Sequence, residues 1–167
     1  MKSTIWLAVC IVFLLETSTM AAECRSLPTV HQSTKSLMEN TNLGGHVWTH
    51  VSDLHSKPYK ASWYDTQKSK SLFTSESAFQ SAWSIWHSGR VTMPIPKNCG
   101  GQASSSVDCI KASDIGIYKA RRCTAVDESK VCINSFAFTP KSVKFVYKKR
   151  WGKWILRTAY PSWSNCR

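Results

Sequence analysis

The predicted fold is decided by residues 143–161, VKFVYKKRWGKWILRTAYP. Apolar and polar side chains alternate in this stretch on both sides of a basic segment that ends at Gly152. Alternation with a period of two is typical of β-strands, and a glycine between two such runs is typical of a tight turn. The alternating residues are Val143, Phe145 and Tyr147, then Trp154, Leu156, Thr158 and Tyr160. We therefore expect an antiparallel hairpin with its turn at residues 150–152.

Two segments upstream of the hairpin show helical periodicity. Residues 42–54 place apolar side chains three or four positions apart, with Asn42 as the expected N-cap. Residues 74–88 do the same, with Thr74 as the expected N-cap and Gly89 as the expected end. The apolar residues are Leu43, Val47, Val51 and Leu54 in the first segment and Phe79, Ala82, Trp83 and Trp86 in the second. We expect the second set to lie in the core.

The remaining segments carry weaker patterns. Residues 23–41 predict a polar, loosely packed N-terminal segment, residues 56–71 an exposed basic loop, and residues 104–106 a flexible stretch. Further strands are expected at Ile115, Ile117 and Val131–Phe138. These patterns predict a single α+β domain over residues 42–167, with helices early and an antiparallel sheet late.

Composition favours a folded, cationic protein. The chain has 167 residues, which suits one domain, and Lys+Arg 22 against Asp+Glu 10 gives a net charge of +12. Hydrophobic residues make up 43% of the chain and eight residues are tryptophan, which excludes a disordered basic tail because such tails lack apolar surface to pack. The excess charge indicates a polyanionic partner, namely nucleic acid, anionic lipid or a sulfated glycan.

The first 22 residues have the features of a secretory signal peptide. Lys2 precedes an unbroken apolar run from Ile5 to Leu15, and small residues lead to an expected cleavage after Ala21 or Ala22. The run is shorter than the roughly 20 apolar residues that a membrane-spanning helix needs. We therefore expect a secreted, extracellular protein.

Six cysteines follow this leader, and Cys10 lies within it. They are Cys24, Cys99, Cys109, Cys123, Cys132 and Cys166. An even number in an oxidising compartment predicts three disulfides, whose pairing stays open, although a bond between Cys24 and Cys166 could join the two ends. No CxxC pair occurs in the sequence, which disfavours a zinc ribbon.

Two histidines, His46 and His50, are the first candidates for chemistry. On a helix their spacing would place both on one face, where they could bind zinc with Asp53, His55 or a distant residue as a third ligand, although the glutamate of an HExxH motif is missing. They could instead cleave a phosphodiester without metal, because an imidazole with a pKa near 6.5 suits a general base at neutral pH. A plain surface position on the helix is the third interpretation.

Thr158 and Tyr160 are two residues apart on a predicted strand, so both side chains point to the same side. Their hydroxyls could hydrogen-bond one phosphate, and the neighbouring Arg157 and Lys153 could supply positive charge. Other hydrolase classes find no support, because no GxSxG motif occurs and the acidic residues show no paired spacing.

Three motifs occur in one order along the chain. They are Gly44-Gly45-His46 with His50-Val51, Ser71-Leu72-Phe73-Thr74 with the helix after it, and Thr158-Ala159-Tyr160-Pro161. Together they resemble the ribonuclease A-like toxin domain found at the C-termini of bacterial contact-dependent inhibition proteins. The resemblance covers residues 44–161. It implies a ribonuclease A-like fold, with N-terminal helices packed on a curved antiparallel sheet, and RNA cleavage that needs no metal or cofactor.

The resemblance also implies roles for individual residues. His50 is the first choice for the general acid or base and His46 the second, while Thr158 and Tyr160 would hold the phosphate or assist proton transfer. The arginine that the family carries downstream of its HV histidine is absent, and Lys60 is the nearest cation that could replace it. Further RNA-binding residues are expected at Arg157, Lys153 and Lys57.

The expected function is therefore that of a secreted, monomeric endoribonuclease, acting as a toxin or defence effector with RNA as its substrate. No protein inhibitor can be inferred from the sequence. The alternative is a non-catalytic cationic protein that binds anionic membranes or glycans through exposed Trp151, Trp154 and Trp163. A zinc hydrolase and a ribonuclease-like fold without activity also remain open.

Overall fold

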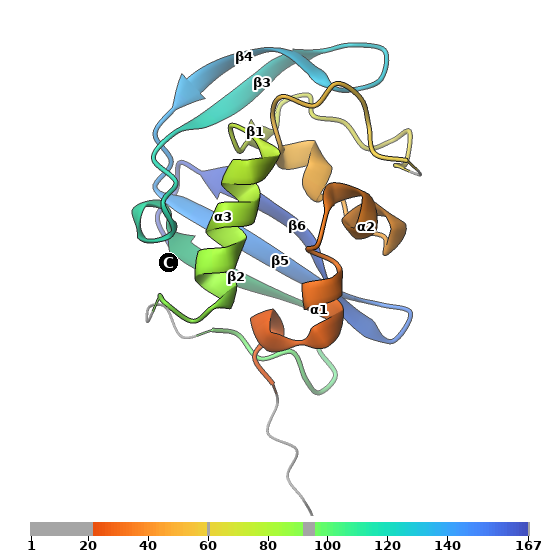
Figure 1. Cartoon of the computed structure of the whole chain (residues 1–167), viewed down its shortest axis with the longest axis vertical. Coiled ribbons are helices and arrows are strands. Elements are labelled where there is room, and N and C mark those ends of the chain that lie inside the picture. The colour runs from red at the N-terminus through yellow and green to blue at the C-terminus, as the bar shows by residue number, and fades with distance from the viewer. Residues whose placement is uncertain (1–21, 60, 92–95, 167) are drawn as a thin grey trace, which may run out of the picture.

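Two three-stranded antiparallel sheets form the framework, with strand orders β1-β3-β4 and β2-β5-β6 (Figure 1). The computed structural model describes residues 22–59, 61–91 and 96–166. The predicted signal peptide therefore lies outside the described residues, apart from Ala22. Among the described residues, no helix is both long and apolar enough to cross a membrane.

The helices, with 3-10 helices marked η, alternate with strands only in the middle of the chain. The helices are η1 (Cys24–Ser26), α1 (Pro28–Gln32), α2 (Leu37–Asn42), η2 (Val47–His50), α3 (Glu76–His87) and η3 (Ala112–Ile115). The strands are β1 (Ser71–Leu72), β2 (Ser105–Lys111), β3 (Ala120–Val126), β4 (Cys132–Phe138), β5 (Ser142–Arg150) and β6 (Lys153–Ser162).

The C-terminal hairpin is confirmed. β5 and β6 pair through a two-residue turn, Trp151-Gly152, whose φ angles are +45° and +77°. Positive φ at both positions is the geometry of a type I′ turn, which matches the twist of the two strands. β2 pairs with the other side of β5, so the flexible stretch expected over residues 104–106 is wrong, because Ser105 and Ser106 begin this strand.

The pairing of β6 with β5 skips one residue. Arg157 has no partner on β5 and forms a β-bulge. Because an extra residue shifts the alternation by one position, Leu156 before the bulge and Ala159 after it both lie in the core. Thr158 and Tyr160 therefore face the opposite side of the sheet from Leu156, and the single alternation expected through this strand is wrong.

The structure confirms one of the two further strand predictions, in the β1-β3-β4 sheet, and not the other. β4 confirms the strand expected over residues 131–138, and it pairs with β3, which pairs in turn with β1. Ile115 ends η3 and Ile117 follows Gly116 outside any strand, so the strand predicted there is wrong. Both isoleucines are buried, which explains why their spacing looked like that of a strand.

The N-terminal segment packs against the β2-β5-β6 sheet, so the loose packing expected over residues 23–41 is wrong. α1 and α2 lie beside β6 (Figure 1). The Ser33 hydroxyl accepts a hydrogen bond from the Leu156 N–H at 2.9 Å. The Asn40 amide donates to the carbonyls of the same two residues at 2.9 and 2.7 Å and accepts from the Val47 N–H at 3.0 Å. These buried bonds tie both helices to β6.

The helix predicted over residues 42–54 is wrong. Gly44 has φ +83°, which ends α2, and Gly45 packs so closely that a Cβ there would overlap the Asn40 amide. The chain then forms only the short 3-10 helix η2. Val47 is nevertheless fully buried, so the apolar pattern reflects burial on a turn and not a continuous helix.

α3 confirms the other predicted helix. Its N-cap is Ser75, one residue after the expected Thr74, and its end precedes Gly89, which has φ +74°. The four predicted core residues are buried: Phe79, Ala82, Trp83 and Trp86. The ring centroids of Trp83 and Trp86 lie 5.4 and 6.4 Å from that of Phe145, so α3 covers the core face of the β2-β5-β6 sheet (Figure 1).

The six cysteines after the leader form three disulfides, as predicted. The pairs are Cys24–Cys99, Cys109–Cys166 and Cys123–Cys132. The bond suggested between Cys24 and Cys166 is wrong, because each bonds to a cysteine in the middle of the chain. The protein is thus a disulfide-stabilised α+β fold with two small antiparallel sheets, and its disulfides fit folding in an oxidising compartment.

Candidate active site

The two candidate histidines lie at the two ends of η2, which is hydrogen-bonded to β6 at one end and to the residue after β1 at the other. The N–H of His46, the residue before η2, donates to the carbonyl of the bulged Arg157 at 2.8 Å. The carbonyl of His50, the last residue of η2, accepts from the N–H of Phe73 at 2.8 Å. Phe73 directly follows β1, so one sheet holds each end of the turn.

The His50 ring is oriented by two contacts. Its Nδ1 lies 2.7 Å from the Ser71 carbonyl oxygen, so Nδ1 carries the proton and donates it, which leaves Nε2 as an acceptor. The ring also stacks on Tyr160, with centroids 5.1 Å apart and planes inclined by 30°. The two sheets therefore meet at this pair, since Ser71 belongs to β1 and Tyr160 to β6.

The environment of His50 disfavours its charged form. Burial lowers its pKa from the ordinary value of 6.5 to about 4, with a further contribution from the positive charges of Lys70 and Arg122. The hydrogen bond to Ser71 opposes this shift only in part. His50 is thus a neutral imidazole at pH 7, the state that can accept a proton.

His46 is also neutral at pH 7. Its pKa is lowered to about 3, by burial first and then by the nearby charges of Arg157, His50, Lys70 and Arg150. Asp65 Oδ1 lies 3.9 Å from His46 Nδ1, which is too far for a hydrogen bond but close enough for an ion pair with a protonated ring. The effect of His50 on His46 places the two imidazoles within electrostatic reach of each other.

Buried polar atoms without a partner occur around these histidines. Within the described part of the chain, His46 Nδ1, Thr158 Oγ1 and Arg150 Nε have no hydrogen-bond partner. Buried polar groups are normally paired, so unpaired ones call for an explanation. Thr158 shares its face of β6 with Tyr160, which stacks on His50, so its hydroxyl is available to a polar ligand held at the imidazoles.

Positive charge surrounds the histidines from several elements. Arg157 NH1 donates to the Gly44 carbonyl, which fixes this side chain beside the loop that carries His46. Arg122 lies opposite Ser71 in the pairing of β3 with β1, and this pairing brings its charge to His50. Lys144 pairs with Tyr160 across the hairpin and so lies on the same face of the sheet.

Three cations near the histidines, Lys70, Arg122 and Lys144, were missed by the sequence prediction. Lys70 directly precedes the Ser71–Thr74 motif, so its position beside the motif was an available signal. Arg122 carries no local signal, because its approach to His50 depends on strand pairing between distant segments. Asp65 was also missed, and its loop is held in place by Gln67, whose amide donates to the carbonyls of Trp48 and Val51 at 2.7 and 2.6 Å.

The predicted site residues are thus partly brought together. His50, His46, Thr158, Tyr160 and Arg157 form one cluster around η2 and the β6 bulge. Lys60 lies outside the described residues. Lys57 is on the preceding loop, and no hydrogen bond or ion pair in the described ranges joins it to the histidines. Lys153 begins β6 and lines a separate hollow at the hairpin turn.

The alternative functions gain less from the structure. Trp151 and Trp163 are 80% and 44% exposed, but Trp154 is 8% exposed and packs in the core, so the expected exposure of Trp154 is wrong. Among the described residues, no three His, Cys, Asp or Glu side chains are grouped so that they could hold a metal ion.

No protein-family model, curated protein or solved structure matches the chain. The geometry of the histidine cluster therefore has to support any functional assignment.

Proposed function

We propose that the protein is a secreted, cationic ribonuclease that cleaves RNA without a metal ion, on a ribonuclease A-like fold. The observation that supports this most directly is the stacking of the neutral His50 ring on Tyr160, beside the unpaired Thr158 hydroxyl and within the field of several cations. Cleavage of a phosphodiester uses groups of these kinds: a neutral imidazole that can take the 2′-hydroxyl proton, hydroxyl donors to the phosphate oxygens, and positive charge around the transition state.

His50 acts as the general base in this proposal. Its Nε2 takes the proton of a ribose 2′-hydroxyl, and the 2′-oxygen then forms a bond to the adjacent phosphorus. The bond between phosphorus and the 5′-oxygen breaks, and a proton delivered to that oxygen gives a 5′-hydroxyl end. The other product carries a 2′,3′-cyclic phosphate. The hydrogen bond from Nδ1 to Ser71 supports this role because it keeps Nε2 free to accept.

His46 delivers the proton to the leaving oxygen. In the free protein its pKa is about 3 because burial and four nearby positive or titratable groups disfavour its charged form. A doubly negative phosphorane beside the ring would offset these cations and favour the protonated imidazole. The unpaired Nδ1 atom supports this role, since no described residue occupies its hydrogen-bonding position.

The remaining residues of the cluster bind the phosphate and stabilise its charge. The hydroxyls of Thr158 and Tyr160 donate to the non-bridging oxygens, and Lys70, Arg122 and Arg157 offset the negative charge of the phosphorane. The net charge of +12 supports a salt-sensitive attraction to RNA that does not depend on sequence. The three disulfides support action outside the cell, as a toxin or defence effector.

The test is cleavage of a fluorescent RNA oligonucleotide by the disulfide-bonded protein in EDTA. We expect activity in the wild type and a loss of at least about a hundredfold in His50→Ala, because general acid–base catalysis contributes roughly 10²–10⁴-fold. His46→Ala and Tyr160→Phe should also lose activity, whereas the exposed His31→Ala should not. Inactive wild-type protein with all three disulfides verified would overturn the proposal, as would activity that EDTA abolishes.

A further inference from the structure

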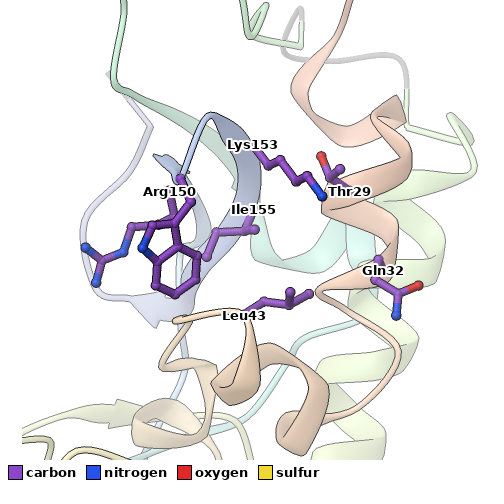
Figure 2. Close-up of a pocket in the computed structure, with 7 residues that line it drawn as sticks. Thr29, Gln32, Leu43, Arg150, Lys153 and Ile155 are labelled. Atoms are coloured by element: carbon purple, nitrogen blue, oxygen red, sulfur yellow. The ribbon is translucent and has the colours of Figure 1, made fainter.

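A hollow lies at the turn end of the β5–β6 hairpin, between the hairpin and α1 (Figure 2). Its volume is about 280 Å³, near the lower end of the range for small-molecule pockets. It is lined by Thr29, Gln32, Leu43, Arg150, Trp151, Lys153 and Ile155. Only Arg150 among these residues belongs to the surroundings of the candidate histidines.

The lining combines apolar surface with polar groups at one side. Leu43 and Ile155 provide the apolar part. On α1, Thr29 provides a hydroxyl, and Gln32 provides its amide oxygen as an acceptor, since its amide nitrogen donates to Glu39 at 2.7 Å. In Figure 2 the Lys153 side chain extends from β6 toward Thr29, so a cation stands at the same rim. This set suits a flat ring that has a hydrogen-bonding edge and an attached anion.

Trp151 is an unusual residue for its position. Its φ of +45° lies in the region that a type I′ turn requires and that Asn and Gly adopt most readily, whereas a bulky residue there is strained. Its indole is 80% exposed, so core packing does not explain it. The Arg150 guanidinium carbon lies 6.0 Å from the indole centroid, at the outer limit for a cation–π contact.

The Gly44 loop lies beside residues of both the hollow and the candidate active site. A methyl group on Gly44 would lie 3.6 Å from both Arg150 Nε and the Trp151 ring. The carbonyl of the same Gly44 accepts a hydrogen bond from Arg157, and the charge of Arg150 contributes to the lowered pKa of His46. An RNA strand bound at the histidines could therefore extend past Arg150 into the hollow.

We propose that this hollow is a subsite for one base of the RNA, near the scissile phosphate. The base stacks on Trp151, its edge meets Thr29 and Gln32, and Arg150 and Lys153 contact the flanking phosphates. The inference rests on the proposed ribonuclease function. It adds a place where the protein binds the substrate through a base and not through its backbone alone.

The test measures binding separately from cleavage. The full disulfide-bonded protein is titrated with a six-nucleotide 2′-O-methyl RNA, which cannot be cleaved, and with an abasic oligonucleotide of the same length and charge. We expect the wild type to prefer the base-containing RNA and Trp151→Ala to reduce that preference at least fivefold, since the stacking of one base on the indole is lost. Trp151→Phe should restore part of the preference.

Two matched controls separate the subsite from general attraction. Trp63→Ala removes another exposed indole, which is 68% exposed, and should leave the preference unchanged. Lys148→Ala removes an exposed charge of β5, and we expect it to weaken the binding of both oligonucleotides equally. Lys153→Ala should weaken the binding of the base-containing RNA more than that of the abasic oligonucleotide.

The possible results distinguish this inference from the proposed function. An unchanged preference in Trp151→Ala, in protein that cleaves RNA, would overturn the subsite and leave the ribonuclease intact. A Trp151-dependent preference in protein that cleaves nothing would support the subsite and overturn the ribonuclease. Binding of anionic vesicles that depends on Trp151, with no preference for bases, would assign the hollow to membranes and overturn the inference.

Discussion

The Thr158 hydroxyl is buried without a hydrogen-bond partner in the described ranges, a state that costs roughly 1–3 kcal/mol. A change that keeps the shape and removes the hydroxyl should therefore not destabilise the fold. We expect Thr158→Val to keep or slightly raise the free energy of unfolding in urea and to lower RNA cleavage at least about tenfold, because a donor to the phosphate is lost. A loss of stability in place of activity would show that the hydroxyl has a structural partner.

Among single residues, the sequence could identify those whose role follows from the spacing of nearby residues in the chain. Thr158 and Tyr160 could be paired because residues two apart on a strand share a side, and the bulge precedes both of them. Arg122 could not be identified, since it meets His50 only through the pairing of β3 with β1. Long-range pairing of this kind leaves no trace in a short window of sequence.

At the scale of elements, the junction between α2 and η2 depends on a residue without a side chain. A Cβ on Gly45 would overlap the Asn40 amide, which bonds three buried backbone groups. We expect Gly45→Ala to lower the free energy of unfolding by about 2–4 kcal/mol, because those groups would lose partners. Gly101→Ala is the control, since Gly101 has positive φ but open space around it, and it should cost about 1 kcal/mol.

Elements were predicted well where one periodicity ran unbroken. The aromatic stripe from Phe79 to Trp86 identified α3, and the alternation around Gly152 identified the hairpin. The prediction failed over residues 42–54, where an apolar stripe continued across Gly44 and Gly45 although two adjacent glycines favour a break. It failed again at Arg157, because a period of two cannot show where one strand has an extra residue.

At the scale of the whole molecule, the neutral histidine pair makes stability depend on pH. The pKa values are about 4 for His50 and about 3 for His46 in the folded protein, against 6.5 in the unfolded chain. Below pH 6.5 the unfolded state binds protons that the folded state does not, so this stability is complete above pH 6.5 and is lost as pH falls toward 4. Between pH 8 and pH 4 we expect the His50→Gln variant to lose ~3 kcal/mol less of its free energy of unfolding than the wild type.

The measurement is urea denaturation of wild type and His50→Gln at pH 8, 6.5, 5 and 4. The free energy of unfolding should fall more steeply with decreasing pH in the wild type than in the variant, because the variant has one fewer group to protonate on unfolding. His31→Gln serves as the control, since this side chain is exposed. Parallel curves for wild type and His50→Gln would contradict the buried, neutral state assigned to His50.

The bulge at Arg157 divides β6 into two segments that are out of phase with each other. Leu156 faces the core on the turn side of the bulge, and Ala159 faces the core on the other side. Because these residues are three positions apart and not two or four, the alternation of core positions shifts by one across the bulge. A deletion of Arg157 would remove the bulge and leave Thr158 opposite Val146 and Ala159 opposite Phe145, so these side chains would keep the faces they have now. Such a deletion would therefore remove one cation and its hydrogen bond to the Gly44 carbonyl, while the reactive and packing positions of the strand stayed as they are.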